Sequence, residues 1–129
     1  MLRFLLDTHA LLWLFSGDRA LSDQAFEVIS DPATRILVSA ASAWEIATKL
    51  RLGKLSFGQD LVQDFRGYLD RAGLYEFPLL IDHGISAGSL PGVHKDPFDR
   101  MLAAQCKAES IPIISNDRTF DLYGVRRIW

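Results

Sequence analysis

The chain has 129 residues and a mass of 14.5 kDa, which predicts one domain over residues 1–129 with a single hydrophobic core. Its 49% hydrophobic and 23% charged residues exclude a disordered or collagen-like chain. The 14 basic and 16 acidic residues give a formal charge of −2, which argues against a protein that is drawn to nucleic acid or membrane by its overall charge.

Short apolar runs alternate with longer segments of helical period, the pattern of strand–helix repeats in an α/β domain. Apolar residues fill nearly every position of these runs, as in parallel strands that are buried on both faces. We therefore expect a three-layer α/β domain in which helices flank a five-stranded, mainly parallel sheet, with strands at Leu2–Leu6, Ile36–Ser39, Tyr75–Pro78, Pro112–Ser115 and Val125–Ile128.

Capping residues, glycine and proline mark the ends of the predicted helices. Asp96 and Pro97 open one of them, because the aspartate can cap free amides and proline suits the first helical position. An apolar stripe at helical spacing defines another, which a glycine closes. These helices run from Ser22 and Asp23 through Ser30, from Leu61 through Val62, Phe65 and Leu69 to Gly73, and from Pro97 to about Glu109.

Four carboxylates fall near the ends of predicted strands or early in the helices that follow. Asp7 ends the first strand, Glu45 lies in the helix after the second, Asp99 opens the helix after Asp96, and Asp117 comes two residues beyond the fourth strand. Ligands of an open parallel sheet bind outside the carboxyl ends of its strands, where the strand order reverses. The four acids can therefore converge on one site.

Each acid alone also has a structural explanation. Ser42 and Glu45 match the S-x-x-E capping box, and Glu45 with Lys49 forms a favourable i,i+4 ion pair. Helix capping and the helix dipole can account for the other three acids, and for any one acid taken alone the structural explanation is favoured. The hypothesis of a functional site therefore depends on the four acids together.

A hard divalent cation is the better explanation for four clustered acids. Clustered carboxylates repel one another and lose solvation, and a cation with oxygen ligands compensates both costs. The three histidines have no H-E-x-x-H spacing and there is no cysteine pair, so zinc is poorly supported. We predict Mg²⁺ or Mn²⁺.

Two hydroxyls and two histidines lie beside the proposed ligands. Thr8 and Ser115 are predicted to support the site by orienting a carboxylate or a bound water, although helix capping explains them equally well. His9 and His94 can contact substrate or transfer a proton, but a lone histidine near a turn is more often a surface or packing residue.

The lone cysteine and the apolar segments indicate a soluble, cytoplasmic protein. Cys106 cannot form an internal disulfide, and Asp7 interrupts the apolar amino terminus before a signal-peptide core could form. The longest apolar run, Ala10 to Phe15, is far below the ~20 residues of a membrane-spanning helix. Trp13 and Trp44 are interpreted as core residues.

Taken in order, these segments resemble the PIN-domain ribonucleases, and in particular the VapC-type toxins of bacterial toxin–antitoxin pairs. The resemblance covers essentially the whole chain. It rests on Leu-Leu-Asp-Thr-His-Ala-Leu-Leu-Trp (5–13), Ser-Ala-Ala-Ser-Ala-Trp-Glu-Ile-Ala-Thr-Lys (39–49), Gly-Lys-Leu (53–55), Leu-Pro (90–91), His-Lys-Asp-Pro-Phe-Asp-Arg-Met-Leu-Ala-Ala-Gln (94–105), Ile-Ile-Ser-Asn-Asp-Arg-Thr-Phe (113–120) and the closing Val-Arg-Arg-Ile-Trp.

The resemblance implies a site, a cofactor and partners. It makes Asp7, Glu45 and Asp99 acidic site residues and Asp117 the fourth; many relatives have threonine where this chain has Ser115. Asp96 is characteristic of this subgroup and is interpreted as a cap. The resemblance also implies a five-stranded parallel sheet, dependence on Mg²⁺ or Mn²⁺, RNA cleavage, inhibition by a VapB-like antitoxin, and a homodimer.

The predicted mechanism is in-line attack on an RNA phosphodiester by water that a cation activates. Asp7, Asp99 and Asp117 would hold the metal, and Glu45 would position a second ion or the water. Receiver domains fit worse because Thr8 follows Asp7 where an acidic pair is needed, and phosphatases of the haloacid-dehalogenase type need an aspartate where this chain has His9. The alternative is a catalytically idle PIN-like module that only binds another protein.

The position of the four acids changes the meaning of the charge. Setting them aside leaves 12 of the 16 acidic residues against 14 basic ones, so the remainder of the molecule is mildly basic. Six basic residues close to the site segments are predicted to meet the RNA backbone: Lys49, Arg51, Lys54, Lys95, Arg100 and Arg118.

Overall fold

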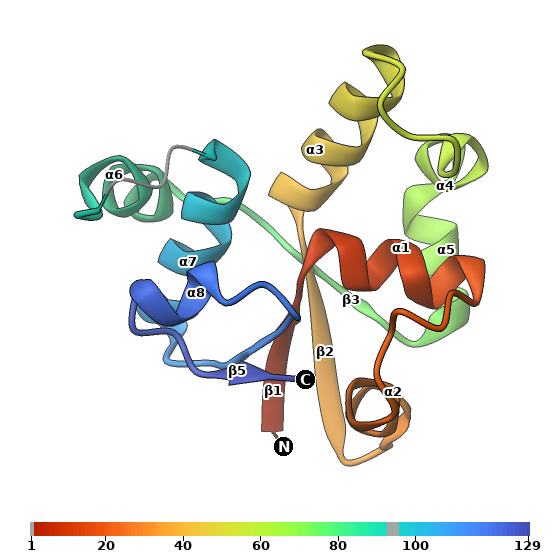
Figure 1. Cartoon of the computed structure of the whole chain (residues 1–129), viewed down its shortest axis with the longest axis horizontal. Coiled ribbons are helices and arrows are strands. Elements are labelled where there is room, and N and C mark those ends of the chain that lie inside the picture. Colours follow the sequence, from red (N-terminus) through yellow and green to blue (C-terminus); the bar gives the residue numbers. More distant parts are fainter. Residues whose placement is uncertain (1, 93–95) are drawn as a thin grey trace.

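A computed structural model describes residues 2–92 and 96–129 of the chain (Figure 1). Its strands form one sheet in the order β3-β2-β1-β4-β5, and every neighbouring pair is parallel. The strands are β1 Leu2–Leu6, β2 Thr34–Ser39, β3 Tyr75–Phe77, β4 Ile113–Ile114 and β5 Arg127–Ile128. The predicted five-stranded parallel sheet is confirmed.

Several strand ends differ from the prediction. β2 begins two residues earlier than expected, because Thr34 already pairs with the first residue of β1. The prediction placed Pro78 and Pro112 in strands, but proline has no N–H to give to a ladder, and both lie outside them. β5 begins after Val125, whose N–H bonds instead to the carbonyl of Phe120 in a turn, at 3.3 Å.

Helices connect all the strands. They are α1 Thr8–Ser16, α2 Asp23–Ser30, α3 Ala40–Arg51, α4 Gln59–Gln63, α5 Phe65–Ala72, α6 Ile81–Ser89, α7 Pro97–Glu109 and α8 Thr119–Leu122. The caps predicted for α2 and α7 are confirmed: Ser22 accepts from the amide of Ala25, and Asp96 accepts from the amides of Phe98 and Asp99. α6 was not predicted, because its two glycines lower its helix propensity.

The single helix predicted from Leu61 to Gly73 is wrong, because α4 and α5 are separate helices. Asp64 divides them with φ −143° and ψ 53°, outside the helical region. Aspartate favours such breaks because its side chain competes with helical hydrogen bonding. Leu61 and Leu69 are nevertheless both buried in one core, so the apolar stripe continues across the break. Gly73 closes α5 in the left-handed region, as predicted.

Two cores lie on opposite faces of the sheet, so the expectation of a single hydrophobic core is wrong, because helices cover both faces. Leu5 and Ile113 face one core with residues of α7 and α8, while Leu6 and Ile114 face the other with residues of α1, α2, α4 and α5. Figure 1 shows α6, α7 and α8 on one side of the strands and α1, α2, α4 and α5 on the other. The predicted three-layer arrangement is therefore confirmed.

No helix within the two described ranges is long and apolar enough to cross a membrane.

Candidate active site

The strand order reverses between β1 and β4, and the candidate site lies at this point. β2 and β3 lie on one side of β1, and β4 and β5 lie on the other. Asp7 directly follows β1, and its N–H donates to the carbonyl of Ile114 in β4 at 3.0 Å. Ser115 directly follows β4, whereas the prediction makes it the last residue of that strand. Both side chains therefore occupy the crevice where such sheets bind ligands.

Asp7 is held at both carboxylate oxygens. Its Oδ1 accepts from the backbone N–H of Thr8 at 2.7 Å, and its Oδ2 accepts from Ser115 Oγ at 2.7 Å. Only 3% of the residue is exposed. The carboxylate also caps α1, so the structural explanation accounts for the hydrogen bond from Thr8 to Asp7. Capping alone does not account for the hydrogen bond to a hydroxyl 108 positions away.

The Ser115 hydroxyl joins two of the predicted site residues. It accepts from the backbone N–H of Asp117 at 3.0 Å and donates its one proton to Asp7. Asp117 is half-buried, and its Oδ1 accepts from the N–H of Thr119 at 2.9 Å. Ser115 thus fixes the direction of the Asp7 carboxylate, and its supporting role at a metal site stays a prediction.

Helix α3 brings Glu45 to the same place. Ser39, not Ser42, caps this helix, with its Oγ accepting from the N–H of Ala41 at 3.0 Å. The capping-box interpretation is therefore wrong: Ser42 lies inside the helix, and its Oγ accepts from Thr8 Oγ1 at 2.8 Å. Nothing in the sequence signals this contact, because the S-x-x-E spacing that suggests a cap is also the spacing of one helical turn. Glu45, on the next turn, is buried.

Two of the other predicted site acids, Glu45 and Asp117, interact electrostatically with Asp7. Burial raises the pKa of Asp7 from 3.8 to about 6, while the hydrogen bonds from Ser115 and Thr8 lower it. The charges of Glu45 and Asp117 also raise this pKa, and the value of about 6 includes all of these effects. Negative charge therefore accumulates at the carboxyl end of β1.

The fourth acid, Asp99, lies in the first turn of α7 and is half-buried. Asp96 fixes this turn, because its Oδ1 accepts from the N–H groups of Phe98 at 2.9 Å and Asp99 at 3.2 Å. The ring of Phe98 packs edge-on against Trp44, with centroids 4.6 Å apart. Each ring directly precedes a predicted site acid, so the contact brings α7 and α3 together beside the site. Trp44 was expected in the core but is 54% exposed, because it lies on this outer contact.

The donors fit a hard divalent cation in their chemistry. All four acids offer oxygen, and the buried carboxylate of Asp7 is incompletely neutralised by its hydrogen bonds. Within residues 2–92 and 96–129, however, no three His, Cys, Asp or Glu side chains are arranged to hold a metal ion. The assignment of these acids as ligands stays a prediction.

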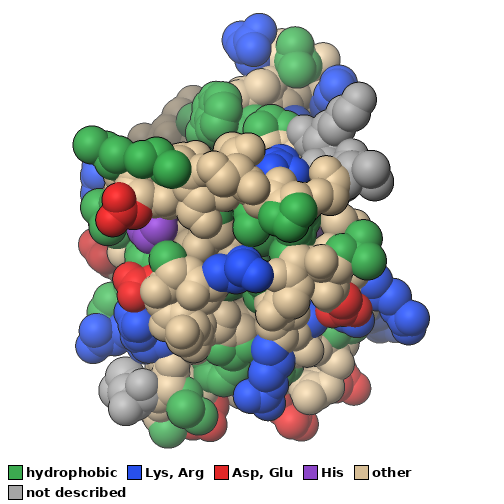
Figure 2. Space-filling model, turned by 90° about the vertical axis from the view of Figure 1, so that its left-hand side faces the viewer, with side chains coloured by type: hydrophobic (Ala, Val, Ile, Leu, Met, Phe, Trp, Pro, Cys, Tyr) green, Lys and Arg blue, Asp and Glu red, His purple; other side chains and the backbone are tan. Residues whose placement is uncertain are grey.

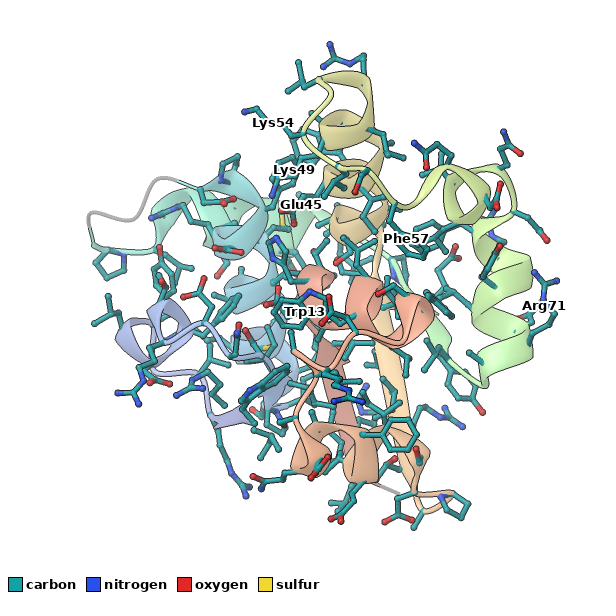
Figure 3. The ribbon with its side chains drawn as sticks, turned by 45° about the vertical axis from the view of Figure 1, so that its right-hand side comes forward. Trp13, Glu45, Lys49, Lys54, Phe57 and Arg71 are labelled. Atoms are coloured by element: carbon teal, nitrogen blue, oxygen red, sulfur yellow. The ribbon has the colours of Figure 1, made fainter. Side chains whose placement is uncertain are left out.

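The basic residues near the site have different surroundings. Arg100, expected to meet RNA, instead donates Nε to the carbonyl of Ala87 at 3.0 Å and Nη2 to that of Leu90, so its guanidinium serves the fold. Lys49 forms the predicted ion pair with Glu45. Figure 3 shows Lys49, Lys54 and Glu45 along the side of α3 that faces α7.

Other predicted residues have no demonstrated part in the site. His9 is exposed, and its ring lies against Trp13 with centroids 6.0 Å apart. His94 and Lys95 lie outside the described residues.

The family model of the PIN domain matches residues 4–125. No curated protein matches the sequence. A chain in the crystal structure of VapBC2 from Rickettsia felis, bound to a DNA fragment from their promoter, has 13% identity and a TM-score of 0.69 over 98% of this chain and 97% of that chain. A chain in a toxin–antitoxin complex from Klebsiella pneumoniae has 17% identity and a TM-score of 0.61 over 89% of this chain and 87% of that chain. A chain in the crystal structure of FitAcB from Neisseria gonorrhoeae has 17% identity and a TM-score of 0.55 over 96% of this chain and 95% of that chain.

Proposed function

This chain belongs to the PIN domain family, and from that membership we propose that it is a Mg²⁺- or Mn²⁺-dependent endoribonuclease of the VapC type, the toxin of a toxin–antitoxin pair. The observation that carries the proposal is the buried Asp7 at the reversal of strand order, held by Ser115 and repelled by Glu45 and Asp117. A buried carboxylate beside other carboxylates destabilises the folded protein unless a cation or a substrate group neutralises its charge.

The chain's own residues hold and orient the reacting groups in this proposal. Asp7, Asp99 and Asp117 would hold the cation, with Glu45 beside them. A bound cation neutralises the phosphodiester and lowers the pKa of water. Ser115 fixes the direction of Asp7, and Asp96 fixes the turn that carries Asp99. The exposed Arg51, Lys54 and Arg118 can approach the RNA backbone.

Partners follow from the same proposal. Similar folds occur in the VapBC2 structure and in a structure described as a toxin–antitoxin complex, so we propose a VapB-like antitoxin and a homodimer for this chain. Exposed hydrophobic side chains at the start of α6, including Leu80, Ile81 and Ile85, support binding of another protein. Figure 2 views the side that carries α6, α7 and α8, where hydrophobic side chains lie among lysines and arginines.

The proposal predicts that Asp7→Asn abolishes RNA cleavage while the protein stays folded. Antitoxin-free protein is incubated with total cellular RNA in Mg²⁺, in Mn²⁺ and in EDTA, and the new RNA ends are mapped. Wild type should cleave only with a divalent cation, and Asp7→Asn should lose at least about 100-fold in rate, because it removes a proposed ligand.

Asp82→Asn is the matched control, because Asp82 is exposed on α6. It should cleave like wild type. Cleavage by Asp7→Asn at the wild-type rate would exclude this site. A wild-type protein that neither cleaves RNA nor gains stability from Mn²⁺ would favour the catalytically idle module.

A further inference from the structure

Lys49 forms an ion pair with Glu45, a buried acid of the candidate site. Its Nζ pairs with Oε2 of Glu45, one helical turn earlier on α3. The Glu45 side chain is 3% exposed, whereas the carboxylates of the other described ion pairs are all more than a third exposed. Exposed pairs contribute little, but a buried carboxylate needs a partner. Lys49 is therefore the internal counter-ion of this acid.

The ammonium of Lys49 can leave Glu45 without unfolding the helix. The side chain is 26% exposed, so it reaches solvent while its partner does not. Lysine carries its charge on a flexible four-carbon stem, with three donors that accept many directions. Lys49 follows Glu45 on α3, and both lie on the same side of this helix as Lys54, which comes after its end (Figure 3), so movement of the stem can carry the ammonium from Glu45 toward solvent.

A cation held by these acids would compete with Lys49 for Glu45. Glu45 acts on Asp7 electrostatically, so both carboxylates belong to one negative site. A divalent ion in that site would repel the nearby ammonium and would offer Glu45 a stronger partner. The RNA backbone would bring a phosphate, which is a suitable new partner for a lysine.

We propose that Lys49 is an exchangeable counter-ion: it neutralises Glu45 when no divalent cation is bound, and it pairs with a substrate phosphate when the cation is present. This inference rests on the proposed function and deepens it. Lys49 thereby makes cation binding weaker in the absence of RNA. By linkage, RNA and cation then favour each other's binding, because the phosphate removes the lysine from the acid.

Two measurements on Lys49→Gln test the exchange, and Lys54→Gln is the matched control for the first of them, Mn²⁺ binding without RNA. Lys54→Gln removes the same charge from an exposed position close by. Calorimetric titration with Mn²⁺ alone should show about tenfold tighter binding by Lys49→Gln and a change within about twofold for Lys54→Gln. Lys49→Arg should bind Mn²⁺ like wild type, because it keeps the charge.

The second measurement is cleavage of total cellular RNA at Mn²⁺ concentrations that saturate each variant. Lys49→Gln should cleave at about a tenth of the wild-type rate or less, since the phosphate partner is missing. A purely structural role would change both quantities in the same direction, whereas the exchange predicts tighter cation binding with slower cleavage. Lys49→Met, which keeps the apolar stem, serves as the second variant if Lys49→Gln does not fold.

Equal or weaker Mn²⁺ binding by Lys49→Gln, or wild-type cleavage at saturation, would overturn the inference. Failure of the proposed function gives a different pattern. In that case the wild type neither binds Mn²⁺ nor cleaves RNA, and no substitution at position 49 matters.

Discussion

Ser115 determines how the carboxylate of Asp7 points. Its hydroxyl has one proton and two acceptor positions. The N–H of Asp117 occupies the acceptor side, which leaves the proton for Asp7. Because the residue is fully buried, water does not replace either hydrogen bond in the folded protein. One hydroxyl therefore links the segments that follow β1 and β4.

We expect Ser115→Ala to slow cleavage by about 10- to 100-fold and to destabilise the protein by about 1–3 kcal/mol. The Ser115 hydrogen bond lowers the pKa of Asp7, so its loss moves that pKa above about 6. Asp7 then stays protonated to a higher pH. The acidic limb of the rate profile, measured from about pH 5.5 to 8.5 at limiting Mn²⁺, where protonation of Asp7 competes with cation binding, should shift upward.

Ser115→Thr is the control for this prediction, because it keeps the hydroxyl. It should restore the position of the acidic limb. An unchanged profile in Ser115→Ala would show that the hydroxyl does not govern ionisation of Asp7 during the reaction.

The sequence predicted individual site residues where they follow strands. Asp7 and Ser115 stand at the ends of apolar runs, so the sheet alone places them at one edge. Ser42 and Lys49 were harder to interpret, because on a helix the spacing of three or four residues serves capping, ion pairing and site formation alike. Only the tertiary contact from Thr8 to Ser42 separates these possibilities.

At the scale of elements, the start of α7 positions Asp99. Asp96 satisfies the N–H groups of Phe98 and Asp99, and Pro97 at the first position needs no such partner. The guanidinium of Arg100 then binds carbonyls at the end of α6. The direction of the first turn is thus fixed from both sides.

Asp96→Ala should destabilise the protein by about 1 kcal/mol, the usual effect of losing an N-cap. It should also slow cleavage by at least about tenfold, because the turn that carries Asp99 loses its hydrogen bonds. Unfolding in urea and RNA cleavage measure the two effects. Asp96→Asn keeps the acceptor oxygen and should restore both.

Ser22→Ala provides the matched control, because Ser22 caps α2 through the N–H of Ala25 at 3.0 Å. It should lose similar stability with little change in cleavage. If Asp96→Ala and Ser22→Ala slow cleavage equally, the cap of α7 has no special part in the site.

Element boundaries were predictable where a cap or a buried run marks them. β1, α2 and α7 match because apolar runs and capping residues act locally. The break between α4 and α5 at Asp64 was not predictable, because Leu61 and Leu69 keep the same apolar face on both sides of it. The prediction that Trp44 lies in the core was wrong for a similar reason. Its hydrophobicity is evident from the sequence, but its contact with Phe98 depends on how α3 packs on α7.

At the scale of the whole molecule, the net charge of −2 conceals an uneven distribution. The charges of Glu45 and Asp117 act on Asp7 at the end of β1, and Asp7 and Glu45 are buried, so part of the negative charge is concentrated there. The rest of the chain is formally basic. A cation at the site would therefore relieve a local excess of charge, and the relief would appear in the free energy of unfolding.

The pKa of Asp7 predicts how metal-free stability depends on pH. It is about 6 in the folded protein against an ordinary value of 3.8, so protonation favours the folded state. That stabilisation is complete below about pH 3.8 and is lost as the pH rises through about 6. Asp7→Asn lacks this loss. In EDTA, its stability relative to wild type should increase by about 2 kcal/mol between pH 4 and pH 8.

Millimolar Mn²⁺ at pH 8 should reverse the loss in wild type, by about 2.7 kcal/mol at 100 times the dissociation constant. Urea unfolding with and without Mn²⁺ measures it. The double variant Asp7→Asn, Asp99→Asn should gain nothing, whereas the exposed pair Asp60→Asn, Asp82→Asn should respond like wild type. Equal stabilisation of both double variants would place the ion elsewhere. A gain that is lost only in the Asp7→Asn, Asp99→Asn protein would place the ion at the carboxyl end of β1 or at the start of α7, so that the cation relieves the charge that accumulates there.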